Sequence, residues 1–267
     1  MLNPPPTQDS PLLSLFGALF FTIVFTTSAW SLWHRRHAWG WWESPITMAN
    51  TLLAIGVLAL LPMIFWRDNG WWAWTYLLSY MTVMAGLGYF IVALKRRQRH
   101  GPLPNNWLRH HVLFPYLFGT LAALYFFFTS GSWHTPHLLH QDFATHNWVT
   151  PEAFAFWIAC DTVGFYSFMR IAILLLALRA DSRRGDRRNV NIYLGSATAG
   201  MTVCVIGVIA GIHDKTSATT LATIMALVFL MSTPQMVISA MSWRSKHRKL
   251  LTPDRETTNS QNSISNH

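Results

Sequence analysis

The chain has 267 residues, of which 51% are hydrophobic and 12% are charged, and its formal net charge is +9. A soluble domain carries about 25% charged residues, so this composition is not that of an ordinary soluble protein. The two cysteines, Cys160 and Cys204, both fall inside apolar stretches, which argues against a disulfide framework.

Long apolar stretches take up nearly the whole chain. A helix needs about 20 apolar residues to cross ~30 Å of hydrocarbon, and in lipid only a helix pairs all its backbone polar groups within such a segment. We therefore predict an all-α membrane bundle with seven spans: Leu12–Trp33, Ile46–Trp66, Trp71–Leu94, Val112–Ser130, Glu152–Leu178, Val190–Ile212 and Ala218–Trp243.

The predicted domain organisation is simple. Residues 1–11 form a short extracytoplasmic N-terminus, residues 12–243 form one membrane domain, and residues 244–267 form a basic and then polar, disordered tail. Most of the tryptophans, Trp107 among them, lie near predicted span ends, where indole prefers the headgroup level.

The basic residues gather in alternate connections between the spans. They follow the first, third, fifth and seventh spans, whereas the intervening loops hold only Arg67 and Lys215. Because Lys and Arg near span ends favour the cytoplasmic side, we predict the N-terminus outside and the C-terminus inside, in a plasma (inner) membrane. The basic residues then lie near membrane lipids, where the attraction to anionic headgroups is worth about 1 kcal/mol per residue. We predict no nucleic-acid partner.

The start of the second span carries the first candidate site. Ser44 is expected as the N-cap and Pro45 as the first helical residue. Thr47 and Asn50 then lie three residues apart on one helix face. In the functional interpretation they are a hydroxyl nucleophile and a polarising amide. In the structural alternative Thr47 bonds the backbone and Asn50 bonds a neighbouring helix, as such residues often do in membranes.

The start of the fourth span carries a histidine pair, His110 and His111. The predicted topology puts it on the same side of the membrane as Thr47. Histidine is the natural general base for a hydroxyl nucleophile. The structural alternative is a hydrated interfacial pair among basic residues.

These two segments carry a resemblance to a known family. Thr47-x-x-Asn50 resembles the T-x-x-N segment of the androgen-induced-gene family of membrane threonine hydrolases. The run HHVLFP, from His110 to Pro115, is similar to that family's H-x-x-V-L-P-type segment and to the His-His-Val element of its bacterial relatives. The resemblance implies a lipid-ester substrate, Thr47 as nucleophile, and His110 as base with His111 as the alternative. No cofactor is predicted.

A third group of polar residues lies in the predicted outer loop. His134, His137 and His140 recur every three residues, and imidazole suits zinc or copper. On one helix these positions drift by about 60° per step, so a shared site would need a loop geometry. We predict an exposed loop and no metal site.

The fifth span holds two charged residues, Asp161 and Arg170. Such residues are costly in hydrocarbon and are functional candidates by default. Nine residues apart, they lie on opposite faces and about 13 Å apart along the axis, so we do not expect them to pair. A small-solute or ion transporter using Asp161 and Arg170 is therefore the rival to a hydrolase. A non-catalytic membrane sensor or immunity protein is a third class.

The sixth span is rich in small residues. Gly207 and Gly211 form a G-x-x-x-G pair, and Gly195 and Gly200 precede it. Small residues let membrane helices approach closely. We predict a tight packing face here, while the oligomeric state does not follow from the sequence.

Overall fold

The computed structural model describes residues 22, 26, 33, 45–59, 72–99, 103–131, 133–134, 150–181 and 184–212. Within these ranges the chain is almost entirely helical and contains no strand, so the all-α prediction is confirmed for this part. The first predicted span, apart from three helical residues, and the seventh span lie outside the described residues, as do both terminal segments.

Four described helices are long and apolar enough to cross a membrane: Ala73–Arg99, Asn105–Thr129, Pro151–Ala180 and Arg187–Ile209. They correspond to the third to sixth predicted spans, and they make this chain an integral membrane protein. The elements are α2 (Pro45–Leu58), α4 (Trp72–Arg99), α5 (Asn105–Leu108), the π-helical turn η2 (Arg109–Leu113), α6 (Phe114–Thr129), α7 (Pro151–Asp181) and α8 (Arg184–Ile212).

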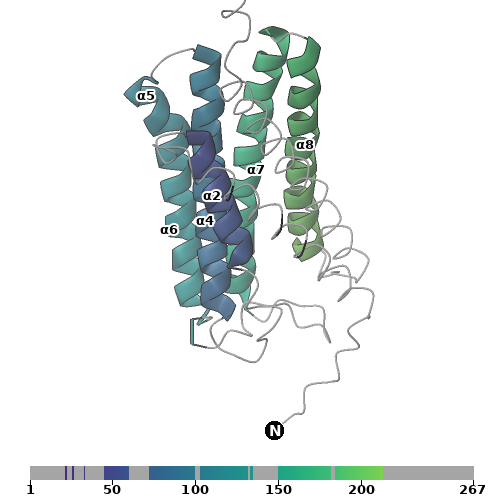
Figure 1. The fold of residues 1–267 in the computed structure, drawn as a ribbon. Coiled ribbons are helices and arrows are strands. Elements are labelled where there is room, and N and C mark those ends of the chain that lie inside the picture. Colours follow the sequence, from purple (N-terminus) through teal and green to yellow (C-terminus); the bar gives the residue numbers. More distant parts are fainter. Residues whose placement is uncertain are drawn as a thin grey trace, which may run out of the picture.

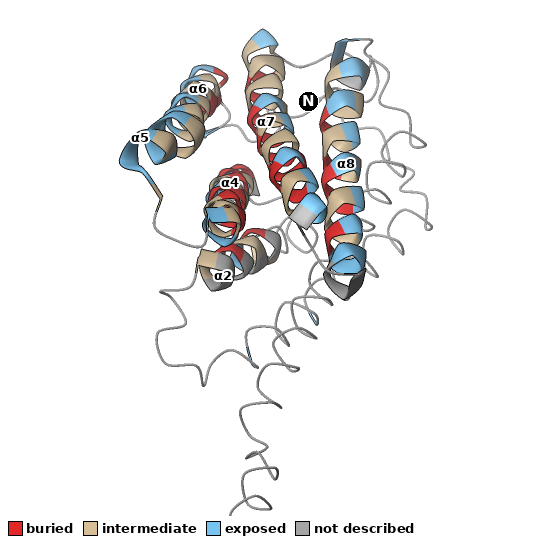
Figure 2. Ribbon diagram, turned by 90° about the horizontal axis from the view of Figure 1, so that it is seen from above, coloured by how far each residue is buried: buried red, intermediate tan, exposed pale blue. Residues whose placement is uncertain are grey.

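The long helices alternate in direction and run side by side (Figure 1). Figure 2 shows α4 between α2 and the pair formed by α6 and α7, with α8 beyond α7. The largest fully buried apolar side chains come from α4, α6 and α7 and are Ile91, Phe127, Phe156 and Leu175. On α6 an apolar stripe that includes Phe118 and Tyr125 is exposed instead, as expected of a surface that faces lipid.

Helices α2 and α4 approach each other closely at two glycines. A Cβ atom at Gly86 would be 3.0 Å from the carbonyl oxygen of Ala49, and one at Gly56 would be 2.6 Å from Cγ2 of Val83. The order of these contacts makes the two helices antiparallel. The start of α2 therefore lies toward the end at which α4 finishes.

The long helices extend past the span ends that the sequence predicts. α4 has 28 residues and α7 has 31, which at 1.5 Å per residue is about 42 and 46 Å. Lys95 to Arg99 and Arg179 thus continue their helices rather than forming loops, because Lys, Arg and Gln are good helix formers. The basic ends of α4, α7 and α8 lie at one end of the bundle, where α5 also begins (Figure 1).

The fourth span begins earlier than predicted and contains an irregular turn. Helix starts at Asn105 rather than Val112, and η2 occupies Arg109–Leu113. Pro115 has no N–H to donate to the carbonyl of His111, and its ring crowds that carbonyl, which accounts for a widened turn at this point. Tyr166 Oη on α7 supplies the missing donor, 3.0 Å from the His111 oxygen.

Candidate functional site

Thr47 and Asn50 lie in the first two turns of α2. That helix begins at Pro45, as predicted. The structure does not describe the side chains of Thr47 and Asn50, so their roles remain a prediction.

The two histidines of η2 have different surroundings. His110 is exposed, and its Nδ1 lies 2.7 Å from the carbonyl oxygen of Asn106. Because a carbonyl only accepts, Nδ1 carries the hydrogen in this arrangement, and Nε2 of the neutral ring keeps its lone pair. His111 is half-buried, with its ring centroid 5.1 Å from that of Trp107. His110 therefore has a ring nitrogen with a free lone pair that can act as a base.

Helix α4 stands between the segments that carry Thr47 and the histidines. Gly86 of α4 faces Ala49 and Leu53 of α2, whereas Gly88 faces Val112 and Tyr116. A separation of two residues turns about 200° around the helix axis. Gly86 and Gly88 therefore face nearly opposite directions. α2 and η2 thus lie toward the same end of α4 but on different sides of it (Figure 2).

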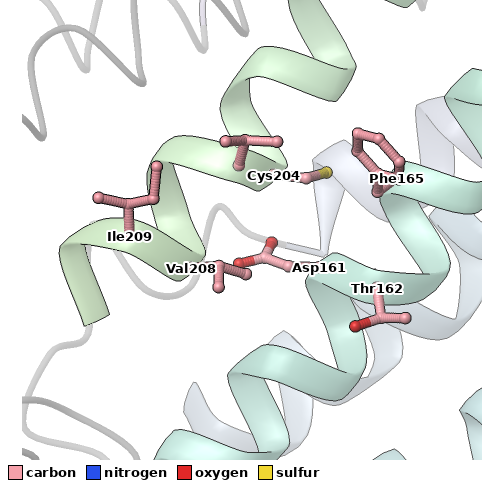
Figure 3. A pocket seen from close by; sticks show the side chains of 7 residues that line it. Asp161, Thr162, Phe165, Cys204, Val208 and Ile209 are labelled. Atoms are coloured by element: carbon pink, nitrogen blue, oxygen red, sulfur yellow. The ribbon is translucent and has the colours of Figure 1, made fainter. Parts of the chain in front are cut away.

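Asp161 lies in a groove between α7 and α8, and its carboxylate points toward α8 (Figure 3). The groove has a volume of about 250 Å³ and is otherwise mostly apolar; it is lined by Asp161, Thr162, Phe165, Cys204, Val205, Val208 and Ile209. The Asp161 carboxylate forms no hydrogen bond or ion pair within the described part of the chain. It faces Gly207 of the neighbouring helix, which has no side chain to offer it a bond.

Polar side chains of α7 and α4 lie near Asp161 on the interior side of the bundle. Cys160 is buried beside it, and Tyr76 and Tyr80 of α4 lie within electrostatic reach of both residues. The Tyr80 hydroxyl is buried and forms no hydrogen bond of good geometry among the described residues, but the thiol of Cys160, a weak hydrogen-bonding group, lies beside it. These tyrosines were not predicted as site residues from the sequence. Their spacing of four residues, which puts both on one face of α4, was the available signal.

Arg170 belongs to a different part of the bundle from Asp161. Its guanidinium carbon lies 6.0 Å from the ring centroid of Trp107 on α5, near the basic end. The prediction that Asp161 and Arg170 do not pair agrees with this arrangement. Sequence reasoning treated Trp107 as one of many interfacial tryptophans and missed this contact.

The outer histidines are only partly covered by the structure. His134 is exposed, while His137 and His140 lie outside the described residues. Among the residues that the structure describes, no group of three or more His, Cys, Asp or Glu side chains is arranged to hold a metal ion.

Comparison of the chain with protein-family models, with curated proteins and with solved structures gives no match. The site is therefore interpreted from its own geometry.

Proposed function

We propose that this membrane protein transports protons or a small cationic solute, with Asp161 as the group that binds them. One observation carries the proposal: a carboxylate on a candidate span lies in an apolar groove with no partner in the described part of the chain. Ionisable residues inside a membrane are expensive and mark ion or proton pathways. A lone carboxylate attracts protons and cations and disfavours anions.

The groups around Asp161 support a pathway rather than a static contact. An Asp with a purely structural role in a bundle interior is expected to form a hydrogen bond to a neighbouring helix. Gly207, which lies against Asp161, has no side chain that could form this bond. Tyr80 adds a buried hydroxyl that lies beside the weakly bonding Cys160 thiol, and a hydroxyl both donates and accepts. Together they connect the groove to the bundle interior.

Flux measurements in liposomes test the proposal. Purified protein is reconstituted in vesicles containing a pH-sensitive dye, and proton or cation uptake is driven by a potassium diffusion potential. We expect Asp161→Asn to lower the flux at least tenfold. Glu152→Gln is the matched control, because Glu152 is a half-buried carboxylate at the start of the same helix, and it should change the flux less than twofold. Equal flux in wild type and Asp161→Asn would refute the role of Asp161.

A lipid-ester hydrolase is the second candidate. Two observations favour it: the hydrogen bond that leaves Nε2 of His110 as an acceptor, and the position of the start of α2 toward the same end of α4 as η2. In this proposal Thr47 is the nucleophile, His110 or His111 is the base and Asn50 polarises the reacting group. The substrate would be a lipid ester, as the resemblance to the membrane threonine hydrolases implies.

An activity-based probe for serine and threonine hydrolases distinguishes the two candidates. The hydrolase proposal expects labelling of wild-type protein that is lost in Thr47→Ala and retained in Asp161→Asn. Labelling that survives Thr47→Ala would remove Thr47 as the nucleophile. Protein that gives neither flux nor labelling would favour the non-catalytic sensor or immunity class.

The full topology is part of the proposal. The four described spans and α2, which is the helical start of the second predicted span, leave the first and seventh apolar stretches to complete seven spans. The clustering of basic residues at one end of the described helices supports a cytoplasmic position for that end. The N-terminus would then lie outside, and the membrane would be the plasma (inner) membrane.

A further inference from the structure

Two cations from different helices converge on the indole of Trp107. Lys95 Nζ of α4 lies 5.7 Å from the ring centroid, and the guanidinium carbon of Arg170 on α7 lies 6.0 Å from it. His111 packs against the same indole and lies within electrostatic reach of both cations. Segments α4, α5, η2 and α7 thus build one positively charged site at the basic end of the bundle.

The charges of this site are incompletely paired. Arg170 Nε is buried and has no hydrogen-bond partner among the described residues. Lys95 donates to Oε1 of Gln98 at 2.8 Å, which leaves ammonium hydrogens for another acceptor. Asp161 is nine residues before Arg170, or about 13 Å along the axis. A buried donor without a partner costs free energy, and the cost is larger when the donor is charged. The excess positive charge of the site therefore favours binding of an anion.

The depth of the site favours a phosphate attached to a lipid. Lys95 directly follows the apolar stretch that ends at Leu94, whereas Arg170 starts eight residues before the end of its own stretch at Leu178. A long basic side chain at this depth extends toward the headgroup level. A guanidinium offers a planar fork of donors that matches phosphate oxygens.

We propose that the phosphate group of an anionic phospholipid binds between Lys95 and Arg170, beside Trp107. The site is separate from the Asp161 groove and does not depend on the transport proposal. In the proposed complex, phosphate oxygens accept from the guanidinium of Arg170 and from the ammonium hydrogens of Lys95 that are not donated to Gln98. The indole contributes a surface over which both cations are held.

Lipid binding to the purified full-length chain tests the site. Detergent-solubilised protein is titrated with phosphatidylglycerol or phosphatidylcholine, and bound lipid is counted by native mass spectrometry. We expect phosphatidylglycerol to bind preferentially and Arg170→Gln to weaken its binding at least fivefold. Lys95→Gln should weaken it as well, and Arg170→Lys should restore part of the affinity. Arg97→Gln is the control, because Arg97 is an exposed cation two residues from Lys95, and it should change binding less than twofold.

Three results would overturn the proposal. Equal losses of phosphatidylglycerol binding in Arg97→Gln and Arg170→Gln would mean that the lipid is attracted diffusely to the basic end rather than bound at a site. Equal binding of the two lipids would mean that the phosphatidylglycerol charge is not recognised. Displacement of phosphatidylglycerol by millimolar inorganic phosphate would assign the site to a free anion instead. Should Arg170→Gln fail to fold, Lys95→Gln and Trp107→Phe carry the test, and unchanged lipid binding in both would refute the site.

Discussion

The carboxylate of Asp161 on α7 lies directly against Gly207 on α8, so that a Cβ atom at position 207 would be 2.6 Å from Oδ2. The same antiparallel register sets Gly164 of α7 against Cys204, and Gly200 of α8 against Phe168. The packing face predicted for the sixth span is therefore confirmed at Gly200 and Gly207. Gly195 is different, since it is exposed and a Cβ there would meet nothing within 4 Å.

Gly207→Ala tests this contact. The added methyl group must push the Asp161 carboxylate or α8 aside, and such overpacking typically costs about 1–3 kcal/mol. Under the transport proposal, flux should also fall, because the binding group has moved. Stability can be followed with a thiol-reactive dye, since Cys160 and Cys204 are buried and react only when the bundle opens.

Gly195→Ala is the matched control on the same helix. With open space around it, the methyl group should leave the flux unchanged and keep or raise the stability, by at most about 1 kcal/mol. Equal behaviour of the two alanine variants would contradict close contact between Gly207 and Asp161.

The hydrogen bond from Tyr166 Oη to the His111 carbonyl predicts that substitutions at Tyr166 and Pro115 have coupled effects on stability. Tyr166→Phe removes that donor, and the loss of a part-buried hydrogen bond costs about 0.5–1.5 kcal/mol. Pro115→Ala adds a backbone N–H that can donate to the same carbonyl, so the double variant should recover part of the loss. Thermal unfolding of the four proteins gives the coupling energy. Strictly additive effects would mean that Pro115 does not create the need for Tyr166.

Tyr80→Phe distinguishes a role of the Tyr80 hydroxyl in the transport pathway from a role of the side chain in packing. The ring remains, and only a buried hydroxyl that lies beside the Cys160 thiol without a well-formed hydrogen bond is removed, so stability should change by less than about 1 kcal/mol. If the hydroxyl serves the Asp161 pathway, flux should fall several-fold. Tyr125→Phe is the control, since that side chain is 64% exposed. Unchanged flux in Tyr80→Phe would exclude this hydroxyl from the pathway.

The elements that the sequence predicted well are those set by local chemistry. Apolar length identified the third to sixth spans, and Pro45 marked the start of α2 because its fixed φ and missing N–H suit a first helical residue. Boundaries were less accurate where polarity was mistaken for a helix end. Lys95 to Arg99 leave the hydrocarbon but still favour helix, and the irregular turn before Pro115 was not predicted although proline is its cause.

The site depends on pairings between distant positions, which a single sequence does not reveal. Asp161 and Gly207 were each identified, one for its charge and one for its lack of a side chain, but their contact depends on the register of α7 and α8. Trp107 reaches Lys95 and Arg170 only through the packing of three helices. The start of α2, which carries Thr47, and the turn η2, which carries the histidines, lie toward the same end of α4 but on different sides of that helix.

Cysteine labelling in intact cells tests the orientation of the bundle. The native Cys160 and Cys204 are buried, so the wild-type background should be low. Asn105→Cys lies at the basic end and Pro151→Cys at the opposite end, and both positions are exposed. Because basic residues favour the cytoplasmic side, a membrane-impermeant maleimide should label Pro151→Cys in intact cells and Asn105→Cys only after permeabilisation. Labelling of Asn105→Cys from outside would reverse the topology and place the phosphate site on the extracytoplasmic face.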